Sequence, residues 1–257
     1  MLRGISVFAV SVALLACATS PTGQRQLQLV PEQQLAEMGA TAYQQMKQET
    51  PVSQQANLRN YVLCVANAIT REVPGGTQWE VTLFEDKAVN AFALPGGKIG
   101  VYTGLLNVAV NQHQLAAVLA HEVAHVLAEH PNARVSAAYA TQAGLDIVQT
   151  LAGASSPGKQ SLLGLLGVGA QYGILMPYGR AQETEADVLG INLMARAGFD
   201  PRESIALWRN MSKAGGAQPP ELLSTHPSNE TRIQRLQEEL PVAMPVYERA
   251  ANKPNCG

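Results

Sequence analysis

The stretch "LAAVLAHEVAHVLAEH", from Leu115 to His130, combines an apolar composition with three histidines and two glutamates. It is rich in alanine and leucine and contains neither glycine nor proline, which favours a helix buried in the core. His121 and His125 lie four residues apart, so one face of that helix presents both imidazoles one turn apart. Glu122 follows His121 directly and is rotated by about 100° around the helix axis.

This spacing suits a metal ion. Two imidazoles on adjacent turns can bind one ion at about 2.0–2.1 Å each, and the glutamate between them can act as general base on a water. The H-E-x-x-H pattern on a helix is typical of zinc metalloproteases. A single core histidine with a hydrogen-bond partner is common, but it does not account for the pair and the glutamate together. We therefore predict metal ligands at His121 and His125, with Glu122 as the base.

A catalytic zinc site needs a third protein ligand. The segment "GRAQETEADVLGINLMARAG", residues 179–198, carries three acids on a predicted helix. Glu183 and Asp187 share one face of it, whereas Glu185 points elsewhere. Glu183 could bind the metal while Asp187 accepts a ring N–H from a ligand histidine. The alternative is a solvated acidic helix start, because acids favour the first turn.

Residues 1–16 have the features of a signal peptide. Arg3 precedes an apolar run of 12 residues, which is too short to span a bilayer. The run ends in "LLAC" and resembles a bacterial lipoprotein signal with Cys17 lipidated after cleavage; the alternative is an ordinary signal cut after Ala18 or Ser20. Ala18 after the cysteine then implies a protein that is lipid-anchored at the periplasmic face of the outer membrane.

The rest of the chain is predicted to form a lipidated tether and one domain. Residues 17–30 are polar and lack periodicity, and residues 31–257 are long enough for a well-buried metallopeptidase-sized domain. Eighteen basic against 20 acidic residues argue against a nucleic-acid partner. Cys64 and Cys256 could pair and join the C-terminal tail to an N-terminal helix, or stay as two thiols.

The pattern of elements predicts an α+β fold that is mainly helical with a small β-sheet. Helical periodicity covers residues 32–49, after Pro31, and 58–73; a strand is predicted at 79–86 and a strand, Pro-Gly-Gly turn and strand at 90–106, with helices thereafter. Residues 161–176 fall short of about 20 apolar residues, so we expect a buried or cleft-lining helix, with membrane insertion as the alternative.

Four stretches carry a family resemblance: "NAFALPGGKIGVYTGLL", "HEVAHVLAEH", "GRAQETEADVLG" and "STHPSNETRIQRL", in this order. Together they resemble the M48 family of zinc metallopeptidases, the gluzincins similar to Ste24, HtpX and Oma1, and especially its periplasmic, lipoprotein-anchored bacterial members. The resemblance implies a gluzincin fold and favours Glu183 over Glu185. It implies one zinc ion per chain bound by His121, His125 and Glu183, with Glu122 as base and Asp187 behind the ligands.

His226 lies in the segment "STHPSNETR". Without the resemblance it is a loop histidine before a helix capped by Ser228 or Asn229. The resemblance implies that His226 approaches the zinc, where it either closes the fourth position reversibly or assists the transition state.

Three further residues lie close to these motifs in the sequence. His130 lies five residues from His125, off the ligand face, and is predicted to be structural. His113 precedes the helix and is predicted to be exposed. The "YGR" before the acidic helix departs from the family pattern, where a serine more often precedes the arginine, and leaves the role of Arg180 open.

These observations predict a zinc metalloendopeptidase for protein quality control, acting on unfolded or misassembled polypeptides of the bacterial cell envelope. Residues 90–94 are predicted as an edge strand that lines the cleft and pairs with an extended substrate; the alternative is an ordinary sheet edge. The expected partners are such polypeptides and, through the N-terminal lipid, the membrane. One alternative is a mostly latent chaperone or assembly factor for outer-membrane proteins, with His226 plugging the zinc site. Another is a metal hydrolase that does not cleave peptides.

Overall fold

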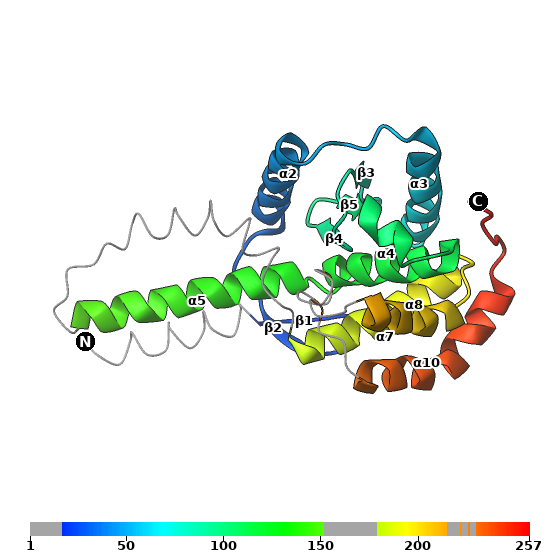
Figure 1. The fold of residues 1–257 in the computed structure, drawn as a ribbon. Coiled ribbons are helices and arrows are strands. Elements are labelled where there is room, and N and C mark those ends of the chain that lie inside the picture. Colours follow the sequence, from blue (N-terminus) through cyan, green and yellow to red (C-terminus); the bar gives the residue numbers. More distant parts are fainter. Residues whose placement is uncertain (1–16, 152–178, 215–221, 223–225, 227–229) are drawn as a thin grey trace.

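A computed structural model describes residues 17–151, 179–214, 222, 226 and 230–257 (Figure 1). Helices dominate these ranges, which confirms the predicted α+β fold. The helices are α2 (Glu32–Glu49), α3 (Ala56–Arg71), α4 (Gln112–Leu127), α5 (His130–Leu151), α7 (Arg180–Arg196), α8 (Arg202–Ala214) and α10 (Glu230–Arg249), with a 3-10 turn η1 (Thr103–Asn107). The strands are β1 (Cys17–Thr19), β2 (Arg25–Leu27), β3 (Glu80–Phe84), β4 (Ala91–Leu94) and β5 (Lys98–Tyr102).

The larger sheet has the order β3-β5-β4. Strand β5 pairs parallel with β3 and antiparallel with β4. The turn between β4 and β5 needs glycine, because Gly96 and Gly97 have φ of 79° and 72°. Strand β4 lies at one edge of this sheet, as predicted for residues 90–94, and packs against α4.

Helix α4 is the central element of the core. It packs against α3, α7, α8 and β4, and its residues from Gln114 to His125 are buried. The Asn111 side chain accepts the N–H groups of His113 (3.0 Å) and Gln114 (2.9 Å), which fixes the start of the helix. A Cβ on Gly190 of α7 would lie only 3.1 Å from the backbone nitrogen of His121. The two helices therefore touch at the level of the motif, which brings the acids of α7 against the histidines of α4.

The prediction of one continuous helix through His130 is wrong. Helix α4 ends at Leu127, Glu129 has a positive φ of 54°, and α5 begins at His130. Pro131 explains the break, because proline cannot donate a helical hydrogen bond and suits the first turn of a new helix. Glu129 separates the two helices, and the Nδ1 atom of His130 lies 2.8 Å from that of His125 in α4.

Residues 17–30 are not the unstructured tether that their composition suggested. Strands β1 and β2 form an antiparallel hairpin in which Cys17 pairs with Leu27. The Gln26 amide donates to the carbonyl of Ala128 at 2.7 Å. The side chain of Gln26 thus binds the residue that follows helix α4. Lipidation of Cys17 stays a prediction, and the segments 1–16 and 161–176 lie outside the described residues.

The C-terminal tail is fastened to the helical body. Cys64 of α3 and Cys256 form a disulfide with a Cα–Cα distance of 5.6 Å, which realises one of the two alternatives left open by the sequence. Gln112 holds the tail as well: its amide donates to the carbonyl of Pro254 (2.8 Å) and accepts the N–H of Cys256 (2.7 Å). None of the helices in the described ranges has the length and apolar character needed to cross a lipid bilayer.

An aromatic cluster lies apart from the main core, between α2 and the sheet, and is formed by Ala42, Tyr43, Phe84, Phe92, Leu94 and Tyr102. Tyr43 is fully buried, and its hydroxyl contacts Thr82 Oγ1 (2.6 Å) and the carbonyl of Ile99 (3.0 Å). This second cluster fixes α2 on the sheet at a distance from the histidines of α4.

Candidate metal centre

The two motif histidines of α4 are buried and face each other. His121 is 4% exposed and His125 is fully buried. Their Nε2 atoms lie 3.1 Å apart. Two imidazole nitrogens at this distance converge on one point, as the spacing in the sequence predicts.

Two acids of α7 contact the motif histidines at different places. Glu183 reaches both histidines, with Oε1 at 3.4 Å from His125 Nε2 and Oε2 at 3.5 Å from His121 Nε2. Asp187, one turn later, places Oδ1 at 3.1 Å from His121 Nδ1. Asp187 therefore accepts the ring N–H on the far side of His121 and leaves its Nε2 directed at Glu183.

His226 completes the group. It is 3% exposed, and its Nδ1 lies 2.9 Å from Glu183 Oε1 and 3.3 Å from His121 Nε2. Its backbone N–H donates to the carbonyl of Leu222 at 2.8 Å, which fixes the loop at this point. The predicted approach of this histidine to the other ligands agrees with the geometry. Ser228 and Asn229, the expected caps of the next helix, lie outside the described residues.

Together these residues form what we call the donor group: His121, His125, Glu183 and His226, all buried, with ligand atoms within 4.8 Å of one another. Four donors placed tetrahedrally at about 2.0–2.2 Å from one centre lie roughly 3.3–3.6 Å apart. For five of the six pairs of these residues, the distance between the ligand atoms runs from 2.9 to 3.5 Å. The donor group therefore fits a metal ion that prefers imidazole and carboxylate ligands.

Glu122 lies beside the donor group without belonging to it. Its Oε1 is 3.4 Å from His226 Nε2, and the side chain is buried. Burial raises the pKa of Glu122, and the neighbouring His226 and His121 oppose that rise. A carboxylate with a raised pKa holds a proton more readily at neutral pH, which suits a general base.

The protonation of the histidines follows their neighbours. Burial lowers the pKa of His121 and Arg232 lowers it further, but hydrogen bonds to Asp187 and Glu183 outweigh both and raise it to about 9. Burial holds the pKa of His125 well below 6.5, against the hydrogen bond to Glu183. Burial opposes ionisation of Glu183, yet hydrogen bonds from three histidines lower its pKa. The carboxylate thus remains charged among them.

Arg232, near the start of α10, belongs to the site but was not predicted as a site residue from the sequence. Its Nη1 lies 2.8 Å from Glu183 Oε2 and its Nε lies 2.7 Å from Asp187 Oδ2. The guanidinium stacks on Trp208 at 3.6 Å from the ring centroid. Arg232 balances the charge of the two acids of α7. It lies in the quoted "STHPSNETRIQRL", but nothing local marks it among other helix arginines.

His130 makes more contacts than its position off the ligand face suggests. Its Nδ1 lies 2.8 Å from His125 Nδ1, and its Nε2 lies 3.2 Å from Glu185 Oε2. Burial lowers the pKa of His130, although Glu185 opposes this. His113 also departs from expectation: it is only partly exposed, because its Nδ1 accepts the N–H of Asp200 at 3.1 Å. Arg180 is exposed at the first residue of α7.

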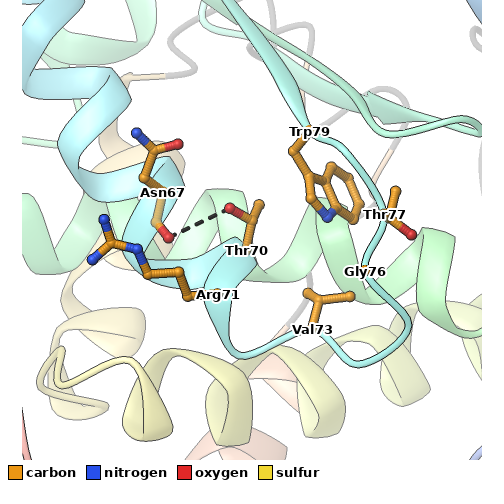
Figure 2. A pocket seen from close by; sticks show the side chains of 7 residues that line it. All are labelled: Asn67, Thr70, Arg71, Val73, Gly76, Thr77 and Trp79. Atoms are coloured by element: carbon orange, nitrogen blue, oxygen red, sulfur yellow. Dashed lines mark hydrogen bonds between the residues drawn. The ribbon is translucent and has the colours of Figure 1, made fainter.

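The larger hollows of the described residues lie away from the donor group. An open hollow of about 510 Å³ lies between the end of α3 and the segment before β3. Figure 2 shows Trp79 and Thr77 across from Thr70 and Arg71 in this hollow. It contains none of the donor group. A much smaller space of about 10 Å³ lies on the other side of His121, between Asp187, Gly190 and Trp208.

A buried donor group next to an H-E-x-x-H helix defines the class of helical metallopeptidases. The sequence model of Peptidase family M48 matches residues 52–240, and the chain belongs to this family. Mitochondrial metalloendopeptidase OMA1 of Schizosaccharomyces pombe is 39% identical over 168 residues, 65% of this chain and 48% of its own. Human mitochondrial metalloendopeptidase OMA1 is 34% identical over 198 residues, 73% of this chain and 37% of its own.

A bacterial relative matches as well. The beta-barrel assembly-enhancing protease of Yersinia pestis is 30% identical over 211 residues, 79% of this chain and 43% of its own. The alignments thus span about half or less of the length of these three relatives.

These comparisons correct the expected location. The prediction of a lipid-anchored protein at the periplasmic face of the outer membrane is wrong, because the relatives of highest identity reported above are mitochondrial metalloendopeptidases. The prediction relied on four residues around Cys17, which precede the matched range.

Proposed function

We propose that this chain is a zinc-dependent endopeptidase that cleaves unfolded or misassembled polypeptides and so serves protein quality control. The observation that carries the proposal is the position of Glu122, a buried carboxylate beside four converging metal donors. The relatives named as metalloendopeptidases support the reaction class.

Zinc is the ion that the donor group suits best. Three imidazoles and one carboxylate are ordinary zinc ligands, and the group lacks the several oxygens that calcium or magnesium would need. His121, His125 and Glu183 would hold the ion, and His226 would either fill the fourth position or leave it to a water. A zinc ion bound here would polarise the scissile carbonyl and lower the pKa of a water toward neutrality.

The chain's own residues carry the proton. Glu122 Oε1 takes the proton of the attacking water and later passes it to the leaving amine. Asp187 keeps the N–H of His121 on Nδ1, so that its Nε2 stays available to the metal. Leu94 and the other side chains of β4 are buried, whereas the strand lies at the sheet edge. An extended substrate can add its backbone to such an edge, which favours unfolded chains.

The test uses the full chain, loaded with zinc, and unfolded casein as substrate. We expect cleavage by the wild type, a loss of about 10²–10⁴-fold in Glu122→Gln, and loss after chelation that added zinc restores. Glu37→Gln, the same change at an exposed position of α2, should cleave like the wild type. Wild-type rates in Glu122→Gln would overturn the proposal.

A second candidate function is a mostly latent chaperone. One observation favours it: His226 is buried within the donor group and occupies the place that a water or substrate carbonyl needs. A protein in this state would bind unfolded chains without cutting them. The two functions can also belong to two states of one protein.

His226→Ala separates the two candidates. If His226 closes the site, casein cleavage rises in the variant; if His226 assists the transition state, cleavage falls. Binding of unfolded casein that is equal in wild type and Glu122→Gln, with no cleavage by either His226→Ala or wild type, would favour the chaperone over the peptidase.

A further inference from the structure

His125 is connected to the outside of the core through a chain of three contacts. Its Nδ1 lies 2.8 Å from His130 Nδ1, and His130 Nε2 lies 3.2 Å from Glu185 Oε2. The other oxygen of Glu185 accepts the hydroxyl (2.6 Å) and the backbone N–H (3.2 Å) of Thr22. We call Thr22, Glu185, His130 and His125 the relay.

The carboxylate at one end of the relay decides where the protons lie. An ionised carboxylate only accepts hydrogen bonds, so the proton of neutral His130 sits on Nε2, facing Glu185. His130 Nδ1 then carries a lone pair, and His125 must donate its own N–H from Nδ1. The remaining lone pair of His125 lies on Nε2, which points at His121 and Glu183. This is the tautomer that a metal ligand requires.

The burial of the relay shows that its geometry is constrained. His125 and His130 are fully buried and Glu185 is 2% exposed. Thr22 holds one oxygen of Glu185, which leaves the other oxygen directed at His130. A histidine that served packing alone could donate its ring N–H to a backbone carbonyl. In His130, by contrast, one ring nitrogen contacts His125 and the other contacts Glu185.

The outer end of the relay belongs to the β1–β2 hairpin. Thr22 lies in its turn, and two neighbouring side chains tie the hairpin to the helices that carry the site. Gln24 donates to the carbonyl of Ala181 at the start of α7 (3.2 Å), and Gln26 donates to the carbonyl of Ala128 after α4 (2.7 Å). The hairpin therefore holds the ends of α4 and α7 in the register that the relay needs.

We propose that His130 and Glu185 are positioning residues for the metal ligand His125, and that Thr22 of the N-terminal hairpin fixes the relay from outside. This inference rests on the proposed zinc site. It assigns a role to His130, Glu185 and Thr22 that neither the motif nor the donor group includes.

The test measures zinc affinity of the full chain by competition with a chelating dye, and the absorption spectrum of the cobalt-loaded protein. Glu185→Gln and His130→Phe should weaken zinc binding about 10–100-fold, the usual effect of removing a partner behind a ligand, and should shift the cobalt bands. Thr22→Val should weaken zinc binding several-fold, whereas Thr22→Ser, which keeps the hydroxyl, should bind like the wild type.

The controls separate this inference from folding and from the proposed function. Thr22 is exposed, so we expect its variants to fold. Tyr43→Phe, which removes a buried hydrogen bond outside the site, should keep the zinc affinity of the wild type. Variants that lose thermal stability but keep the wild-type zinc affinity and cobalt spectrum would overturn the relay and leave the zinc site intact. A wild type that binds no zinc would overturn the proposed function itself.

Discussion

The two histidines of the motif are supported in different ways. The carboxylate of Asp187 contacts His121 directly, at 3.1 Å, and Arg232 balances the charge of Asp187. His125 contacts His130, and His130 in turn contacts the carboxylate of Glu185. Both acids come from α7 and stand two residues apart, on different sides of the helix. One helix thus supports two ligands four residues apart on another, because a third histidine bridges the longer distance.

The difference concerns charge as well as length. The support of His121 contains a buried guanidinium between two carboxylates. The support of His125 contains one carboxylate, one hydroxyl and a second imidazole, and burial lowers the pKa of that imidazole. We therefore expect substitutions in the support of His121 to lower the folding stability more than substitutions in the support of His125, even where the loss of zinc affinity is similar.

The largest effect is expected from Asp187→Ala. It leaves Arg232 buried with one carboxylate fewer, which should lower the free energy of unfolding by about 3–5 kcal/mol. Zinc affinity should fall about 10–100-fold. Urea denaturation and dye competition measure both quantities. Glu185→Gln keeps a hydrogen-bonding group of the same shape and should cost only about 1–2 kcal/mol of stability. Equal stability losses in the two variants would remove the contrast between the supports.

A smaller effect is expected from removing the disulfide, which touches neither support. The double variant Cys64→Ser, Cys256→Ser should lose about 2–4 kcal/mol, because the bond closes a loop between residues 192 positions apart. Zinc affinity of the folded variant should stay at the wild-type value. Calorimetry and dye competition, with reduced wild type as control, check this. If the double variant binds zinc more weakly than the wild type at temperatures where it is still folded, the C-terminal tail does support the ligands.

Gly190→Ala should press α7 directly against the backbone of His121. Its new Cβ would lie 3.1 Å from the backbone of His121, so α7 must move away from α4, at about 1–3 kcal/mol. Zinc affinity should fall several-fold. Gly179→Ala is the matched control, because its nearest neighbour would be 3.7 Å away. If both glycine variants behave alike in denaturation and zinc binding, the close helix contact does not matter for the ligands.

The smallest effect is expected at Tyr43, in the second cluster. Burial raises the pKa of Tyr43 to about 12, against the hydrogen bond to Thr82. The unfolded chain releases this proton first, near pH 10, so the contribution of Tyr43 is complete below pH 10 and is lost as pH rises toward 12. Tyr43→Phe should lose about 1 kcal/mol at neutral pH and show a shallower alkaline decline of stability. An identical alkaline decline in both proteins would contradict the assignment.

The sequence predicted the parts of the site that lie within single helices. The four-residue spacings of His121 to His125 and of Glu183 to Asp187 determine which side chains share a face, so their convergence followed from local geometry. The family resemblance supplied the choice of Glu183 and the approach of His226. The α+β fold and the strand–turn–strand around Pro95 followed from turn chemistry and apolar pattern.

The missed parts depend on contacts between segments far apart in the chain. Arg232 reaches Asp187 across 45 residues, and Thr22 reaches Glu185 across 163, distances over which periodicity carries no information. His130 is different, since a local signal existed. Pro131 follows it directly and indicates the start of a new helix, whereas the prediction extended the first helix through it.

The left-handed residue Glu129 has a consequence for how this chain can vary. The number of residues between His125 and His130 cannot change freely. The positive φ of Glu129, between the two helices, places the His130 ring against the His125 ring. One residue inserted after Ala128 would leave the zinc motif, both helices and every acid in place, and yet rotate His130 by about 100° away from His125. Sequences that conserve the motif but change this interval would therefore need another way to hold their second histidine.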